Sequence, residues 1–112
     1  MIIKYKKQKI NIPIRKVSYF GKVSGLIFKN KETKNLLFEF KKETNMRIHS
    51  FFVFFTFLAI WTNKKNEVIE FRFIKPFNPV IKPKKSFQKL IEIPLNNKNK
   101  KIISYFVGKR KV

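Results

Sequence analysis

The sequence predicts a small, mostly β domain with a barrel-like fold and a short C-terminal helix. Its 112 residues suffice for one hydrophobic core, so we expect a single domain over residues 1–112. Apolar residues alternate with other residues in several segments, most clearly in residues 68–74, which is typical of half-buried strands. Near the C-terminus the period changes, because Ile102 and Phe106 lie four residues apart, as on one face of a helix.

The first part of the chain is predicted to be extended and basic. Residues 1–14 form an N-terminal strand, with clear alternation over residues 10–14. Pro13 cannot donate a ladder hydrogen bond, so this strand should lie at a sheet edge or end there. Residues 36–41 alternate clearly and form the next strand, and the polar residues 42–45 form a turn.

Two central strands are predicted at residues 48–55 and 57–63, joined near Thr56. Both segments carry apolar residues on both faces, so we expect the pair to be covered on both sides. Residues 75–85 contain three prolines and are expected to form an ordered loop. Residues 90–95 alternate again and form a further strand.

The predicted C-terminal helix follows this strand. Asn96 or Asn97 can cap its start, because short polar side chains accept hydrogen bonds from the first free N–H groups of a helix. Gly108 suits a left-handed residue just after the helix end. Residues 109–112 follow as a tail or a last short strand.

Composition excludes several kinds of chemistry. The chain has no cysteine, which removes disulfides, thiolate catalysis, iron–sulfur clusters and cysteine zinc sites. It also has no aspartate and one histidine, His49. Neither a nucleotide-binding glycine motif nor a nucleophilic serine motif is present. We therefore expect no cofactor and no metal site, and we favour a non-enzymatic protein.

The hydrophobic pattern predicts a cytoplasmic protein without a membrane span. The N-terminus lacks the apolar central region of a signal peptide. The longest apolar run, residues 51–61, is shorter than the ~20 residues that a spanning helix needs.

Charge is the strongest compositional signal. Lysine and arginine total 27 against six acidic residues, which gives a formal net charge of +21. Such a potential attracts polyanions such as nucleic acid. An AT-rich genome would produce the same abundance of Lys, Asn, Ile and Phe without any partner, and both interpretations stay open. Because lysine greatly outnumbers arginine, loose charge attraction is favoured over reading of a base sequence.

The basic residues at the two ends of the chain form the predicted polyanion-binding site. If both ends lie on one side of the domain, their cations make one patch. The alternatives are a merely solvated surface and an interaction module for an acidic protein partner. The predicted site consists of Lys4, Lys6, Lys7, Lys9, Lys98, Lys100, Lys101, Lys109, Arg110 and Lys111.

A second hypothesis is a small-molecule or enzymatic pocket inside the barrel. It would use His49 with Glu70 or Glu92, since histidine titrates near neutrality and a desolvated carboxyl can exchange protons. The competing interpretation makes His49 a structural residue at a strand edge. It also makes the two glutamates partners in cross-strand ion pairs.

Several short motifs follow one another in a recognisable order, at residues 25–28, 36–40, 48–52, 60–63, 75–77, 90–94 and 108–112. Together they resemble one protein family, "domain of unknown function 192", in its archaeal form. The resemblance covers residues 16–112 and rests on the order and spacing of the motifs. It implies a small, mostly β, barrel-like domain with a short helix, and it implies no activity.

The chain departs from this family at the acidic and glycine positions. Thr56 and Leu58 stand where the family usually has Pro and Asp, and Asn63 replaces an Asp at a strand end. Asn96 or Asn97 takes the place of a glycine, and Lys109 that of a closing Asp. The apolar framework resembles the family while the acidic groups do not.

Overall fold

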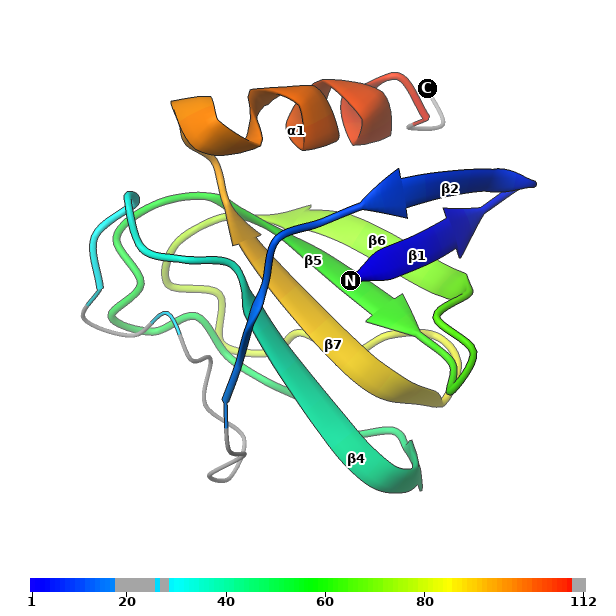
Figure 1. The fold of residues 1–112 in the computed structure, drawn as a ribbon. Coiled ribbons are helices and arrows are strands. Elements are labelled where there is room, and N and C mark those ends of the chain that lie inside the picture. Colours follow the sequence, from blue (N-terminus) through cyan, green and yellow to red (C-terminus); the bar gives the residue numbers. More distant parts are fainter. Residues whose placement is uncertain (18–25, 27–28, 110–112) are drawn as a thin grey trace.

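The structure is a computed structural model, and it describes residues 1–17, 26 and 29–109. It is a compact, mostly β domain with one short helix near the C-terminus (Figure 1). The strands are β1 (Ile2–Tyr5), β2 (Gln8–Asn11), β3 (Arg15–Lys16), β4 (Leu36–Thr44), β5 (Phe57–Thr62), β6 (Val68–Ile74) and β7 (Phe87–Pro94). A 3-10 turn, η1 (Asn97–Asn99), leads into the helix α1 (Lys100–Val107).

The strands form two sheets, and neither is a closed barrel. The larger sheet has five strands in the order β3-β4-β7-β5-β6, with β3 parallel to β4 and all other pairs antiparallel. Over the described residues no pairing joins its end strands β3 and β6. The barrel-like fold predicted from the sequence is therefore not supported. Other segments cover both faces of this open sheet.

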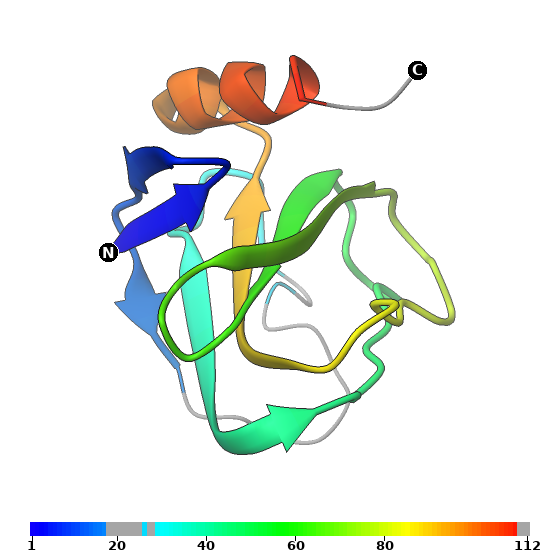
Figure 2. The ribbon, with the colours of Figure 1, turned by 90° about the vertical axis from the view of Figure 1, so that its right-hand side faces the viewer.

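Each face of the large sheet has its own apolar core. Alternation along β5 sends Phe57, Ala59 and Trp61 to one face and Leu58 and Ile60 to the other, and the whole strand is buried. The hairpin β1–β2 and α1 cover the face with Leu58, which we call the helix side (Figure 2). Residues 45–56 and 75–86 lie over the other face, which we call the loop side.

The predicted strand over residues 48–55 is wrong. These residues form a loop, tied to residues 75–86 by an isolated bridge between Ile48 and Ile81. The chain leaves the extended conformation at Phe52, whose φ of 63° is left-handed. The second predicted central strand is confirmed as β5, and the expected covering of both its faces is also found.

The N-terminal segment is a hairpin rather than one strand. β1 and β2 pair through a tight turn whose central residues, Lys6 and Lys7, have φ values of 47° and 70°. Ile3 and Ile12 are fully buried against the helix side of the large sheet. Pro13 follows the end of β2, as expected for a residue that cannot donate to a ladder.

Several boundaries differ from the sequence-based expectation. β4 continues to Thr44 through a register shift after Glu39, so residues 42–45 are not a turn. The C-terminal helix is confirmed, and the Asn96 side chain caps the preceding η1. Gly108 has a φ of −66° and is not left-handed, because the helix ends on right-handed backbone. In the described part of the chain, no helix has the length and hydropathy needed to cross a membrane.

Candidate functional site

The two basic ends of the chain meet on the helix side of the sheet. Aromatic rings join them: Tyr5 lies 6.3 Å from Tyr105 and 5.9 Å from Phe106 between ring centroids. The Tyr105 hydroxyl also donates a hydrogen bond to Gln8 Oε1 at 2.5 Å. The condition set by the sequence analysis, that both ends lie on one side of the domain, is thus met for the described residues (Figure 2).

A groove runs between β2 and α1, and we call it the hairpin–helix groove. Its volume is about 540 Å³. Lys9 lies on the β2 wall of the groove, and Lys101 and Tyr105 lie on the α1 wall. The full lining is Gln8, Lys9, Ile10, Asn11, Lys101, Ile102 and Tyr105. The groove is open and mixed in polarity, which suits an extended charged ligand better than a small apolar one.

The chain segments that form this groove carry many lysines and no acidic side chain. Residues 1–31 and 93–112 contain no acidic residue. The predicted binding lysines that the structure describes are all exposed, namely Lys4, Lys6, Lys7, Lys9, Lys98, Lys100, Lys101 and Lys109. Arg110 and Lys111 lie outside the described residues. The field around the groove is therefore uniformly positive along the chain segments that form it.

Two lysines lie over aromatic rings beside the groove. The Lys109 ammonium is 5.2 Å from the Tyr105 ring centroid, and the Lys6 ammonium is 5.5 Å from that of Tyr5. Cation–π contacts of this kind hold exposed ammonium groups near the surface. Desolvation raises the pKa of Tyr105, and the nearby Tyr5 adds to this shift. The Tyr105 phenol is thereby kept neutral, as a hydrogen-bond donor, well into the alkaline range.

Lys6 and Lys7 occupy a strained turn. A two-residue hairpin turn with positive φ at both central positions favours Asn-Gly or Gly-Gly. Lysine at such a position has a Cβ close to the carbonyl oxygen, which costs about 1–2 kcal/mol per residue. The hairpin tip thus carries two cations where the backbone would prefer other residues.

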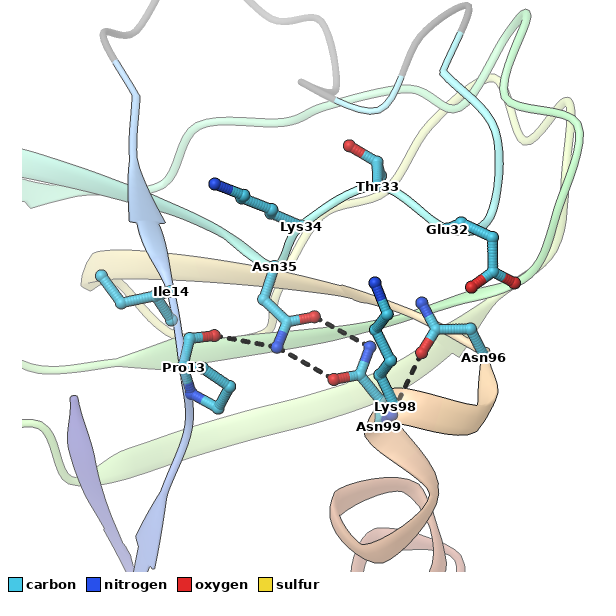
Figure 3. Close-up of a pocket in the computed structure, with 9 residues that line it drawn as sticks. All are labelled: Pro13, Ile14, Glu32, Thr33, Lys34, Asn35, Asn96, Lys98 and Asn99. Carbon is cyan, nitrogen blue, oxygen red and sulfur yellow. Dashed lines mark hydrogen bonds between the residues drawn. The ribbon is translucent and has the colours of Figure 1, made fainter.

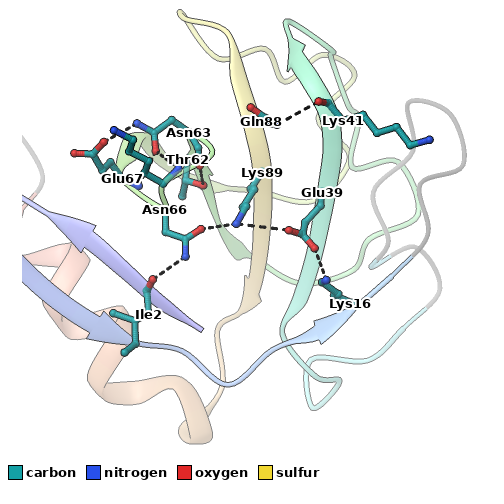
Figure 4. Close-up of polar contacts among 11 residues, drawn as sticks. Ile2, Lys16, Glu39, Lys41, Thr62, Asn63, Asn66, Glu67, Gln88 and Lys89 are labelled. Atoms are coloured by element: carbon teal, nitrogen blue, oxygen red, sulfur yellow. Dashed lines mark hydrogen bonds and ion pairs between the residues drawn. The ribbon is translucent and has the colours of Figure 1, made fainter.

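A polar network fixes the hairpin to the large sheet (Figure 4). Glu39 binds Lys16 at 2.6 Å and Lys89 at 3.5 Å, and Lys89 donates to Asn66 Oδ1 at 2.6 Å. Asn66 in turn donates from Nδ2 to the carbonyl oxygen of Ile2 at 3.1 Å. The hydrogen bond from Lys16 lowers the pKa of Glu39, and Lys89 adds to the effect against partial desolvation.

The structure does not bring His49 together with a glutamate in the cavities described here. His49 is half-buried in the loop after Ile48, and its Nδ1 accepts a hydrogen bond from the Phe51 N–H at 3.3 Å. Its ring lies 5.3 Å from that of Phe51. These contacts are those of a structural residue in a turn. Among the described residues, no group of three or more His, Cys, Asp or Glu could hold a metal ion.

The two candidate glutamates have different surroundings. Glu70 pairs with Arg72 on its own strand at 2.5 Å, and it accepts the Lys84 N–H at 2.8 Å. This is an ion pair, although within β6 rather than across strands. Glu92 is fully buried on the loop side of the large sheet, opposite Ala59. The space beside it measures about 10 Å³, room for about one water molecule.

Sequence reasoning missed a buried amide pair that closes a second cavity, which we call the amide pocket (Figure 3). Asn35 and Asn99 exchange two hydrogen bonds at 3.0 and 2.9 Å, and each also donates to a backbone carbonyl. Those carbonyls belong to Pro13 and Pro94, at 2.9 and 2.8 Å. The pocket measures about 350 Å³. The only signal of this pair in the sequence is the asparagine run after β7, which by itself predicts a helix cap.

The comparisons with known proteins bear on the fold. No family model matches the chain, and no curated protein matches it. One solved structure is similar, with a TM-score of 0.63 at 6% sequence identity. It is a protein of unknown function from Novosphingobium aromaticivorans DSM 12444, and the match covers 90% of this chain and 74% of that one. This likeness shows a shared fold.

Proposed function

We propose that the chain is a non-enzymatic domain that binds nucleic acid through the phosphate backbone, using the basic surface around the hairpin–helix groove. The observation that carries the proposal is the packing of α1 against the β1–β2 hairpin. This packing brings Lys9 and Lys101, one from each basic chain end, to one open groove, in segments without acidic side chains. Lysine is a compact point charge, so we expect little dependence on base sequence.

The strained hairpin tip supports the same proposal. Residues held in unfavourable backbone conformations concentrate at functional sites, where another interaction compensates for their strain. Lys6 and Lys7 are exposed at the tip, with left-handed backbone. A contact between these ammonium groups and phosphates would explain why lysine stands in this turn.

The first test is a titration of labelled duplex DNA and single-stranded RNA, followed by fluorescence anisotropy at several salt concentrations. If about four lysines contact phosphates, the logarithm of the association constant falls with that of salt with a slope of about −3.6 on duplex DNA. A tenfold rise in salt then weakens binding about 4000-fold. Binding that is tight and independent of salt would refute the proposal.

The sharper test replaces the hairpin tip by Lys6→Asn together with Lys7→Gly. These residues suit the turn, so we expect the variant to be about 1 kcal/mol more stable to unfolding. If both lysines contact phosphates, the same variant binds duplex DNA about 60-fold more weakly at about 0.1 M salt. Gained stability combined with lost binding cannot arise from a damaged fold.

A matched control removes the same charge elsewhere. Lys41 and Lys42 are exposed near the end of β4, away from α1 and the hairpin (Figure 1). Changing both to glutamine should leave nucleic-acid binding within about threefold of the parent. Equal losses in the control and in the tip variant would instead indicate attraction by net charge. Capture of an acidic protein, with no binding to either nucleic acid, would favour the interaction-module alternative.

We also propose that the chain is a divergent member of the "domain of unknown function 192" family. The support is the order of the motifs quoted from residues 16–112. Superposition of an established member should bring its acidic positions onto Leu58, Asn63 and Lys109. A different strand order in that member would contradict the proposal.

A further inference from the structure

A second surface, on the loop side of the sheet, carries exposed apolar groups. Four phenylalanines and one valine there are between 41% and 59% exposed, an unusual amount for large apolar side chains in one place. They belong to residues 49–56 and 75–86. We call this set the aromatic loop surface: Phe51, Phe52, Phe54, Phe77 and Val80.

The two loops are built as one rigid unit. Ser50 is fully buried between them: its hydroxyl donates to the Lys75 carbonyl at 2.9 Å and accepts the Asn78 N–H at 2.7 Å. Its backbone also exchanges hydrogen bonds with Phe77 and Asn78. The rings of Phe54 and Phe77 then meet at 5.4 Å between centroids. The exposed rings are therefore held in place by buried hydrogen bonds.

Backbone strain accompanies this exposure. Phe52 and Phe77 have φ values of 63° and 60°, in the left-handed region that bulky residues rarely adopt. Both are about half exposed, at 52% and 50%. An unfavourable backbone conformation at a residue whose ring is half exposed is typical of a functional surface position.

The charge of the two loops indicates which kind of partner fits the aromatic loop surface. Residues 45–56 and 75–86 contain no acidic residue. Their cations are exposed and flank the aromatic loop surface along the chain, namely Arg47, Lys75, Lys82, Lys84 and Lys85. Exposed phenylalanines and cations on the same two loops are complementary to an anionic lipid interface, since rings enter the acyl boundary while cationic groups reach headgroup phosphates.

We infer that the aromatic loop surface docks the protein onto anionic membranes by inserting its phenylalanines at the lipid interface. The geometry of the rings favours lipid over unpaired bases. Phe54 and Phe77 meet edge to face, at 77°, so the face of one ring is occupied by the edge of the other. A stacking platform for successive bases needs open ring faces. The inference goes beyond the proposed nucleic-acid binding, which uses the opposite face of the sheet.

The test uses the full chain with vesicles of phosphatidylcholine, alone or with about one quarter phosphatidylglycerol. Co-sedimentation should show binding to the anionic vesicles and at least about tenfold weaker binding to the neutral ones. Equal binding to both, or none to either, would overturn the inference.

The decisive variant combines Phe52→Asn with Phe77→Asn. Asparagine tolerates the left-handed conformation, so the variant should unfold at the same or a higher denaturant concentration. We expect its partitioning to anionic vesicles to fall about 30-fold, because two half-exposed rings are lost. A matched control, Val107→Asn, removes an apolar residue that is 49% exposed on α1, and it should leave vesicle binding unchanged.

The outcomes separate this inference from the proposed function. Loss of vesicle binding with unchanged DNA and RNA binding supports lipid docking, whatever the hairpin variant does. Loss of RNA binding with unchanged vesicle binding would make the loops a stacking platform and refute lipid docking. A concentration-dependent dimer of the parent, abolished in the Phe52 and Phe77 variant, would instead identify a second copy as the occupant.

Discussion

The buried amide pair gives the sharpest prediction about stability. Asn99→Ala removes three side-chain hydrogen bonds, two with Asn35 and one with the carbonyl of Pro94, at 2.8 to 3.0 Å. The Asn99 side chain makes no capping bond at the start of α1, so no helix cap is lost with it. The perturbation is therefore confined to the pair.

The expected loss follows from the partners left behind. Asn35 is 5% exposed and keeps its bond to the Pro13 carbonyl, but it loses one acceptor and one donor. Each buried group left without a partner costs about 1–3 kcal/mol. The adjacent amide pocket of about 350 Å³ admits water, which offsets part of this cost. We expect the free energy of unfolding to fall by about 2–4 kcal/mol.

Urea unfolding followed by tryptophan fluorescence measures this loss. Trp61 is the single tryptophan and is 1% exposed, so its emission reports on the core. The control is Asn97→Ala, two residues away and exposed, with an expected change within about 0.5 kcal/mol.

A double-mutant cycle completes the test. Asn35→Ala and Asn99→Ala together should lower the free energy of unfolding by at least about 1 kcal/mol less than the sum of the single changes. Once one asparagine is replaced, replacing the other leaves no further amide of the pair without its partner. Strict additivity, or a loss for Asn99→Ala no larger than for Asn97→Ala, would refute the interpretation of the pair as mutually dependent.

Three further predictions concern individual contacts. Because its pKa is lowered, chiefly by Lys16, Glu39 contributes stability above its ordinary pKa of about 4.3 that is lost as pH falls through the lowered value. Glu39→Gln should flatten acid unfolding curves over that window, by less than about 1 kcal/mol, and an unchanged curve would contradict this. Tyr105, whose pKa is raised, should stabilise the fold below about pH 10 and cease to do so as pH rises through its raised value. In an ultraviolet titration Tyr105→Phe should remove a phenolate transition on the alkaline side of the ordinary tyrosine value, and its persistence would assign that transition elsewhere. Ser50→Ala should lower unfolding free energy by about 1–3 kcal/mol and speed amide exchange in residues 75–86, whereas unchanged exchange would show that the loops hold without it.

The sequence by itself determined the secondary structure of those segments in which the apolar period and the turn-forming residues at the segment ends agree. β6 was predicted with its observed bounds, Val68–Ile74, because alternation there is uninterrupted. β5 was predicted one residue too long at its end, and α1 was predicted to end before Gly108 as observed, although its capped start belongs to η1. Composition alone also excluded cysteine chemistry, and it pointed to the lysines at the two chain ends as one surface.

Tertiary contacts decided those local conformations that a short-range sequence pattern cannot predict. Residues 48–55 are as apolar as a buried strand, yet they form a loop, because Ser50 and Ile48 pair with residues 75–86 instead of a neighbouring strand. The hairpin turn at Lys6 and Lys7 was invisible because its residues are unfavourable there.

The same limit applies to the site. Asn35 and Asn99 are 64 residues apart, and only the closing of α1 over the sheet brings their amides into contact. Glu92 has the position of a surface residue in its strand, and it is buried because loops cover a face that alternation marks as polar. Local periodicity records which side of a strand a residue takes, whereas burial depends on what later packs against that side.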